Sequence, residues 1–399
     1  MKLLILDEEF PFPLNTGKRI RTFNLVARLA KSHKVYYIAN GQSDSVGFKA
    51  LAAAGITPVA VERKIPRKSG LLFYLRLLFN LFSRYPYIVS SHYSSLFAEK
   101  LSYCLKQDRF DIVIAEWTPY AVYLQGVRES RKVIVAHNLE HRIWERYFRN
   151  ERNILKKWYI GKQLRKVRRF EMESFAKVDG VAAVSPVEAG EIARYGRELT
   201  VEVVPNGVDL DYFGGEWVEA DNSTMIFVGS MNWRPNQDAI QYFVRDIFPL
   251  IKKDINNAKT VFVGQDPPAS ILKLGDTAGI EIVGRVDDVR PFVRKAGVYV
   301  VPLRIGGGTR LKILEALAMK KAVVSTSVGA EGIAVTPEVN ILIGDSPEEF
   351  ASQVKRVISD KNLRSKLGEA GRELVEKNYG WDRIAVTLEN FLHRLMGES

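Results

Sequence analysis

The sequence has little cysteine and no long uninterrupted run of apolar residues. Cys104 is the only cysteine among 399 residues, which excludes a disulfide framework or a cysteine-based zinc site and favours a reducing compartment. No stretch reaches about 18 consecutive apolar residues, so no transmembrane helix is expected. The opening MKLLILDEEF turns acidic too soon for a signal peptide and predicts a first buried strand. We therefore expect a cytoplasmic protein.

Several sequence patterns of nucleotide and metal sites are missing or incomplete. There is no GxxxxGK[ST] loop, which excludes a P-loop ATPase, and no GxGxxG after the first predicted strand, which argues against a dinucleotide-dependent dehydrogenase. His137 and His141 have the i, i+4 spacing of zinc ligands on a helix, but no third ligand is evident. We expect no metal ion and no other cofactor.

The alternation of apolar runs with helical stretches predicts an α/β fold. A chain of 399 residues exceeds what one hydrophobic core usually serves, so two domains are expected. The runs are continuous rather than alternating, as in parallel strands that are buried on both faces. The predicted strands are 3–6, 34–39, 111–116, 132–137, 180–185, 201–206, 225–230, 260–265, 280–284, 298–303, 322–327 and 341–344.

A polar, glycine-containing segment divides the chain. We interpret 206–224 as a linker between two Rossmann-like domains, 1–212 and 213–380, because the rhythm of strands and helices is similar on both sides. The segment 381–399 holds an amphipathic helix that we expect to pack back toward the N-terminal domain. Ligands of open parallel sheets bind outside the carboxyl ends of the strands, so the loops there are the candidate sites.

The segment GGGTRLKILEAL begins a predicted helix with positive charge at the end where cations are unfavourable. Thr309 is the expected N-cap, which places Arg310 and Lys312 at the positive end of the helix dipole. A bound diphosphate would use both cations and the exposed N–H groups together. Glu315 lies one turn beyond Lys312 and suits a ribose diol. The alternative is an exposed loop with ordinary surface cations.

Two loops in the N-terminal half also follow predicted strands. Gly17 would let the backbone approach a ligand at a helix N-terminus, although turn geometry alone also explains a glycine there. His137 ends the predicted strand 132–137, where a role in a ligand cleft and a structural role both stay open.

The net charge of +12 is concentrated in one segment. Residues 141–170 hold eleven Lys or Arg and two Glu, a balance of +9, which indicates either an anionic partner or a solvated helix face. No nucleic-acid module is recognised, so we expect no nucleic-acid partner. The apolar segment 69–87 carries a polar stripe at Arg76, Asn80 and Arg84, which fits an interfacial helix or an interdomain core helix. We expect peripheral association with the anionic inner face of a membrane.

Several motifs resemble the retaining GT-B glycosyltransferases of the family-4 type. The specific ones are VVPNGVDLDYF (203–213), FVGSMNWRPNQDAIQYF (227–243), IEIVGRVDDVRPFVRKAGVYVVPL (280–303) and GGGTRLKILEALAMKKAVVSTSVGAEGI (306–333). LNTGKRIRTFNLVARLA and AHNLEHRIWER in the N-terminal half are similar to the same family more loosely.

The resemblance implies a GT-B fold and metal-free transfer of a hexose, with retained anomeric configuration, in cell-surface polysaccharide or glycolipid synthesis. The nucleotide-diphosphate-sugar donor would bind the C-terminal domain, and the glycan or lipid-linked acceptor the N-terminal domain. The expected catalytic residues are His137, which matches a family position, and Arg310 and Lys312, which the charge at the helix start indicates. The expected donor-binding residues are Gly17, Gly229, Ser230, Arg234, Gly284, Arg285, Val286, Gly306, Gly307, Gly308, Thr309 and Glu315.

Three positions depart from the family pattern. Gly307 stands where the first Glu of the E-x7-E motif is expected, Ser230 where an Arg is usual and Asn236 near the position of the family's Lys. Arg310 and Lys312 are the expected substitutes for the missing diphosphate cations, with Arg234 as a third candidate. A non-catalytic nucleotide- or glycan-binding subunit, and a nucleotide-sugar epimerase or hydrolase on the same fold, remain alternatives.

Overall fold

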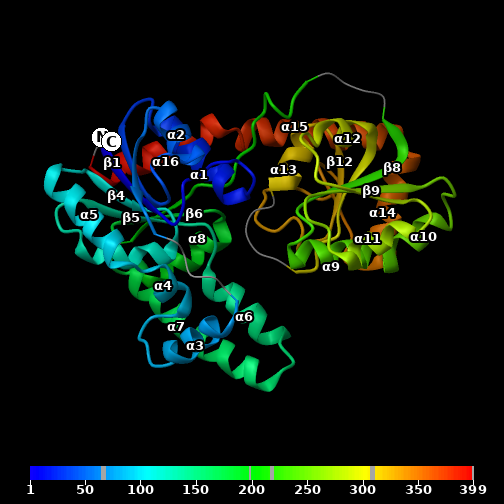
Figure 1. Ribbon diagram of the computed structural model, residues 1–399. Coiled ribbons are helices and arrows are strands. Elements are labelled where there is room, and N and C mark those ends of the chain that lie inside the picture. The colour runs from blue at the N-terminus through cyan, green and yellow to red at the C-terminus, as the bar shows by residue number, and fades with distance from the viewer. Residues whose placement is uncertain (64–68, 197–198, 216–219, 306–310, 398–399) are drawn as a thin grey trace. The chain divides into compact units, whose positions relative to one another are not determined.

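The computed structural model describes residues 1–63, 69–196, 199–215, 220–305 and 311–397. The chain divides into two compact units, Met1–Pro205 with Ile384–Ser399, and Asn206–Arg383. Each unit is built on one parallel sheet with helices on both faces, so the predicted α/β class and the GT-B architecture are confirmed (Figure 1). The unit boundaries fall at 205/206 and 383/384, whereas the sequence predicted 212/213 and 380/381.

The first unit holds a seven-stranded sheet in the order β3-β2-β1-β4-β5-β6-β7. Its middle strands are continuous apolar runs: Leu3, Leu4 and Leu6 of β1 have no exposed surface. The order reverses between β1 and β4, which both pair with neighbours in parallel and place their carboxyl ends at one edge. The strands are β1 Lys2–Asp7, β2 Lys34–Asn40, β3 Thr57–Val61, β4 Ile112–Ala115, β5 Arg131–Ala136, β6 Gly180–Ala183 and β7 Thr200–Val203.

The helices of the first unit include a long basic pair, α6 and α7, that covers most of the segment 141–170. The helices are α1 Gly17–Leu29, α2 Val46–Ala53, α3 Leu71–Asn80, α4 Tyr87–His92, α5 Ser95–Gln107, α6 Glu140–Asn150, α7 Ile154–Phe175 and α8 Pro186–Ile192, with 3₁₀ segments at Thr118–Gly126 and Ala193–Tyr195. No helix in the described ranges is long and apolar enough to cross a membrane.

The second unit holds a six-stranded parallel sheet in the order β10-β9-β8-β11-β12-β13. The strands are β8 Asp221–Val228, β9 Lys259–Val263, β10 Ile280–Gly284, β11 Ala296–Val301, β12 Ala322–Ser325 and β13 Leu342–Ile343. The helices are α9 Arg234–Tyr242, α10 Phe248–Lys252, α11 Ala269–Leu272, α12 Arg290–Lys295, α13 Leu311–Ala318, α14 Pro347–Ser359 and α15 Lys361–Asn378, with a π segment at Phe243–Ile247 and a 3₁₀ segment at Lys273–Asp276.

The segment 206–224 differs from its sequence-based expectation. Residues 206–224 were expected to be a linker, but Val208 is buried in the core of the second unit and its N–H donates to the Tyr379 carbonyl at 2.7 Å. Strand β8 already begins at Asp221. This part of the expected linker is therefore integral to the second unit.

The last helix, α16 (Trp381–Leu395), carries the chain from the second unit back to the first. Its buried residues Phe391 and Leu395 pack against β6, where a Cβ added to Gly180 would lie 2.6 Å from the Phe391 ring. Because Gly180 has no side chain, the helix packs directly on the sheet of the first unit.

Candidate functional site

The second unit brings glycines together at the carboxyl ends of β8, β9 and β10. The Gly229 N–H donates to Val263 and the Gly264 N–H donates to Gly284, both at 2.9 Å. A Cβ on Gly264 would lie 1.9 Å from the Gly229 carbonyl oxygen, so only glycine permits this approach. Gly284 has a positive φ of 76°. The predicted residues Gly229 and Gly284 therefore lie on either side of Gly264 at one edge of the sheet.

Lys312 of α13 reaches the same edge. Its ammonium donates to the Asn236 side-chain oxygen at 2.8 Å and lies 4.1 Å from the centre of the Phe227 ring. A Cβ on Gly229 would approach the ammonium to 2.7 Å. Lys312 thus places a cation beside Gly229 and Asn236, where the family pattern would place its own lysine.

Glu315 lies on α13, one turn after Lys312, and is half-buried. Burial raises the pKa of its carboxyl from 4.5 to about 7, against the attraction of Lys312. A carboxyl in this setting gains from any ligand that donates hydrogen bonds to its ionised form.

The other predicted donor residues of the second unit have varied settings. The Ser230 hydroxyl donates to the Asn232 side chain at 2.8 Å, and Arg234 is exposed at the start of α9. Arg285 is exposed after β10, whereas the side chain of Val286 packs against the hydrophobic core. Five predicted residues lie outside the described residues: Gly306, Gly307, Gly308, Thr309 and Arg310.

In the first unit, His137 follows β5 and contacts Glu116, which follows β4. The His137 Nε2 lies 2.7 Å from the Glu116 carbonyl oxygen and 3.4 Å from its carboxylate. A carbonyl only accepts, so Nε2 carries the hydrogen and Nδ1 is left as an acceptor. Burial lowers the pKa of His137, which favours this neutral form. The Glu116 carboxylate is itself held by the Thr22 hydroxyl of α1 at 2.9 Å.

A charged group surrounds the start of α1. Gly17 is exposed as the first residue of this helix, and the Lys18 ammonium pairs with Asp7 at 2.6 Å and with Glu8 at 2.9 Å. Burial raises the pKa of the Asp7 carboxyl to about 7, although Lys18 opposes the rise. Trp117 lies under the same ammonium at 5.2 Å. Sequence reasoning missed Asp7 and Glu116, although each directly follows an apolar strand run.

His141 does not join His137 in a metal site. Its ring nitrogens lie 2.7 Å from Glu171 and 2.9 Å from Glu191, and the Glu171 carboxylate raises the pKa of His141 despite its burial. The neighbouring Glu140 accepts from the Trp117 indole N–H at 2.8 Å, and burial raises the pKa of Glu140 to about 7.

Comparisons with known proteins identify the family. Residues 17–212 match the family model described as Glycosyltransferase Family 4, and residues 222–360 match the model described as Glycosyl transferases group 1. The chain belongs to the family-4 type of group 1 glycosyltransferases.

Individual relatives agree with this assignment. The chain is 28% identical over 48% of its length to an uncharacterized glycosyltransferase of Methanocaldococcus jannaschii, and the match spans about half, 53%, of that relative. It is 26% identical over 54% of its length to a GDP-mannose-dependent phosphatidylinositol monomannoside mannosyltransferase of Mycobacterium tuberculosis, covering 62% of that protein. The fold resembles a sucrose-phosphate synthase of Thermosynechococcus elongatus, with a TM-score of 0.73, 16% identity and full coverage of both chains.

Proposed function

We propose that this chain transfers a hexose from a nucleotide-diphosphate-sugar donor to a glycan or lipid-linked acceptor, with retention of anomeric configuration and without a metal ion. Cleavage of the donor builds negative charge on the departing diphosphate, which preorganised cations and N–H groups stabilise. In a front-face reaction the departing phosphate takes the acceptor's proton, so the chain needs no dedicated base.

The observation that carries this proposal is the position of the Lys312 ammonium. It is fixed 2.8 Å from Asn236 and beside the Gly229 backbone, at the glycine-lined ends of the strands. Parallel sheets bind ligands at these ends, and the glycines leave room for a diphosphate to approach the backbone. Lys312 thus supplies the cation for the phosphates. The family motif has a lysine near the position of Asn236, and this chain has none there.

Glu315 and His137 supply the remaining proposed contacts. The Glu315 carboxylate accepts from the ribose hydroxyls of the donor, which compensates for the burial of its charge. His137 is assigned to the transferred sugar, as the resemblance implies, because its Nδ1 is an acceptor whose tautomer is fixed by Glu116. The relative that depends on GDP-mannose supports a nucleotide-sugar donor.

A donor panel tests the proposal. UDP, GDP, TDP and their sugars are added to the full chain, and the melting temperature and the release of free nucleotide are measured. A ligand that binds only the folded state raises the melting temperature by mass action. Lys312→Ala should abolish the shift, whereas the exposed control Lys366→Ala on α15 should retain it. The absence of any shift at millimolar nucleotide refutes the transferase proposal, and the anomeric proton coupling of the product tests retention.

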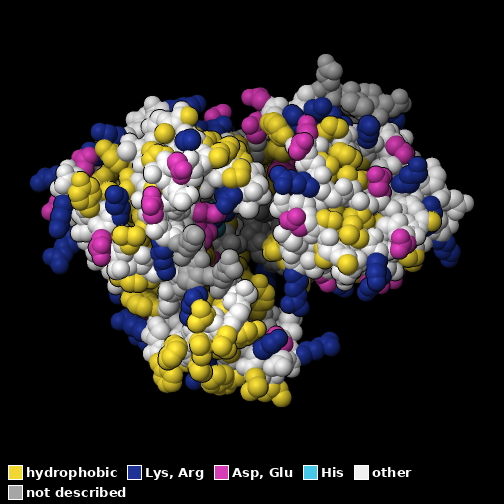
Figure 2. All heavy atoms as spheres, in the orientation of Figure 1, with side chains coloured by type: hydrophobic (Ala, Val, Ile, Leu, Met, Phe, Trp, Pro, Cys, Tyr) yellow, Lys and Arg dark blue, Asp and Glu magenta, His cyan; other side chains and the backbone are white. Residues whose placement is uncertain are grey.

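The acceptor side of the proposal rests on an apolar surface of the first unit. We define the α3–α7 surface by large hydrophobic side chains that are exposed on and next to these helices (Figure 2). Leu71 and Phe79 of α3 are 75% and 71% exposed, and Phe82 is 88% exposed. The members are Leu71, Leu72, Tyr74, Leu78, Phe79, Phe82, Ile154, Leu155 and Trp158.

Contacts of the segment 69–87 with α7 begin at the end of α3. Asn80 is buried and accepts from Gln163 of α7 at 2.9 Å, and Arg84 pairs with Glu173 at 2.9 Å. Asn80 at the end of α3 therefore packs on α7, whereas most apolar side chains of α3 are exposed, as is Arg76. The basic side chains Arg152, Lys156, Lys162 and Arg165 are exposed on and before α7. An apolar face rimmed by cations suits an anionic lipid surface.

Vesicle co-sedimentation tests this membrane contact. The chain should bind vesicles that contain phosphatidylglycerol at low salt, and binding should fall when salt screens the cations. Phe79→Asp should weaken binding at least about tenfold, since a charge replaces an inserted ring. Val187→Asp is the matched control, because Val187 on α8 is 58% exposed and lies outside the surface. Equal binding by both variants, or no binding by the wild type, refutes the contact.

A further inference from the structure

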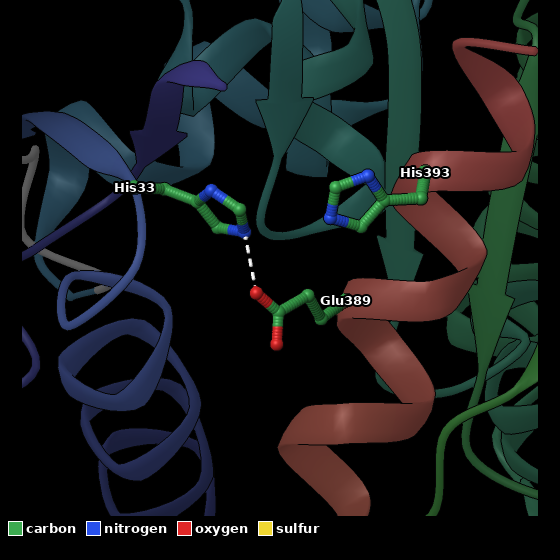
Figure 3. A group of neighbouring side chains, drawn as sticks. All are labelled: His33, Glu389 and His393. Atoms are coloured by element: carbon green, nitrogen blue, oxygen red, sulfur yellow. Dashed lines mark ion pairs between the residues drawn. The ribbon is translucent and has the colours of Figure 1, made fainter. Parts of the chain in front are cut away.

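Three potential metal ligands meet at the C-terminal helix, away from the residues discussed above. His33 lies between α1 and β2, and Glu389 and His393 lie four residues apart on α16, so they share one face of that helix (Figure 3). One ligand atom from each residue lies within 4.8 Å of the other two. Figure 3 shows the two imidazole rings and the carboxylate converging.

The buried His33 ring lacks a hydrogen bond where the group converges. Its Nε2 is 2.8 Å from a Glu389 carboxylate oxygen, but this atom is buried without a hydrogen bond of suitable geometry. The His33 side chain is 4% exposed. A buried polar atom without a hydrogen bond is costly, and a cation among the three side chains would satisfy it.

We propose that His33, Glu389 and His393 bind a divalent transition-metal ion of the Zn²⁺ type. Two imidazoles and one carboxylate are a ligand set that Zn²⁺ prefers, with water in the fourth position. Zinc ligands at about 2.1 Å in a tetrahedron are separated by roughly 3.4 Å, so small rotations of these side chains suffice.

The other ring nitrogen of His33, Nδ1, lies 3.2 Å from the Met1 amino group, whereas Nε2 faces the Glu389 carboxylate. Nε2 is therefore the ring nitrogen that is placed to bind the ion.

The proposed ion fastens α16 to the first unit. Glu389 and His393 come from the helix in which the chain crosses from the second unit, and His33 comes from the body of the first. The ion adds a polar link to the packing of Phe391 and Leu395 on β6. None of the three residues belongs to the proposed donor site, so this proposal stands or falls independently of the transferase activity.

The test compares thermal unfolding of the EDTA-stripped, dialysed full chain with and without Zn²⁺. At 100-fold excess over the dissociation constant, Zn²⁺ should raise the melting temperature by roughly 5 °C, and Mg²⁺ should not. Co²⁺ should give the visible absorption of a low-coordinate site containing imidazole. Mass spectrometry should count one metal per chain.

Variants locate the site. Glu389→Gln and His393→Asn should each remove the Zn²⁺ shift and the Co²⁺ absorption. Arg394→Ala is the matched control on the same helix, because it breaks an ion pair with Glu202 and leaves the three ligands in place. A wild type without a shift or absorption overturns the proposal. Both signals persisting in the two ligand variants would also overturn it. If a variant fails to fold, the wild-type Co²⁺ spectrum and stoichiometry decide alone.

Discussion

Replacing Glu315 by Gln tests whether the buried carboxylate of the proposed donor site lowers the free energy of unfolding. Burial raises the pKa of Glu315 from 4.5 to about 7. A carboxyl with a raised pKa binds more protons in the folded state, so the free energy of unfolding falls as pH rises from 4.5 to 7. Below this window the penalty is absent, and above it the penalty is complete.

The size of the penalty follows from the shift. One pKa unit corresponds to about 1.4 kcal/mol, so the rise to about 7 gives an upper limit of about 3 kcal/mol. Partial exposure of the side chain and the lost attraction to Lys312 reduce the benefit of the amide. We expect Glu315→Gln to be more stable than the wild type by about 1–3 kcal/mol at pH 8, and nearly equal to it at pH 5.

Denaturant unfolding of the full chain at the two pH values measures this difference. Glu281→Gln on β10 is the control, because it makes the same substitution at an exposed carboxyl. A nucleotide should raise the melting temperature of Glu315→Gln less than that of the wild type, since the amide is a poorer acceptor for ribose hydroxyls. A stability gap that is the same at pH 5 and pH 8, or a less stable variant at pH 8, would refute the reasoning.

Three further substitutions probe both units. His137→Asn should lower the transfer rate by about 10²–10³-fold and leave the nucleotide-induced shift in melting temperature unchanged, which steady-state kinetics and thermal unfolding separate. Gly264→Ala should destabilise the fold by at least about 2 kcal/mol in denaturant unfolding, because the new Cβ would lie 1.9 Å from the Gly229 carbonyl oxygen, whereas the open site at Gly190 should accept alanine. Arg21→Ala should cost about 3–5 kcal/mol in the same assay, since the guanidinium is fully buried and donates to two backbone carbonyls.

The sequence predicts the strands well because most of them are buried on both faces. Each predicted apolar run coincides with an observed strand, within a few residues at the ends. The sequence analysis did not predict β3, because it is an edge strand whose first four residues are not fully buried and it contains Pro58. Its apolar run is only the three residues 59–61 directly after a proline, which is too short for periodicity to indicate a strand.

The candidate site was predictable where one segment carries several of its residues. Lys312 and Glu315 share a helix, so their spacing alone indicates a common side. The contacts of Glu116 with Thr22 and His137 join three segments distant in sequence, and only the order of the strands brings them together. Likewise, the direction of the stripe through Asn80 depends on α7, which the local sequence does not reveal.

Three carboxyls whose pKa is raised to about 7 by burial, those of Asp7, Glu140 and Glu315, differ in how their charge is compensated. Asp7 accepts from Tyr37 at 2.6 Å and pairs with Lys18, and Glu140 accepts from the Trp117 indole. For Glu315, the attraction of Lys312 is what opposes the burial penalty. A nucleotide that neutralises part of the charge of Lys312 and donates ribose hydroxyls to Glu315 would replace this compensation with hydrogen bonds. Glu315 therefore has the most to gain from a ligand, which is the physical reason to place the ribose there.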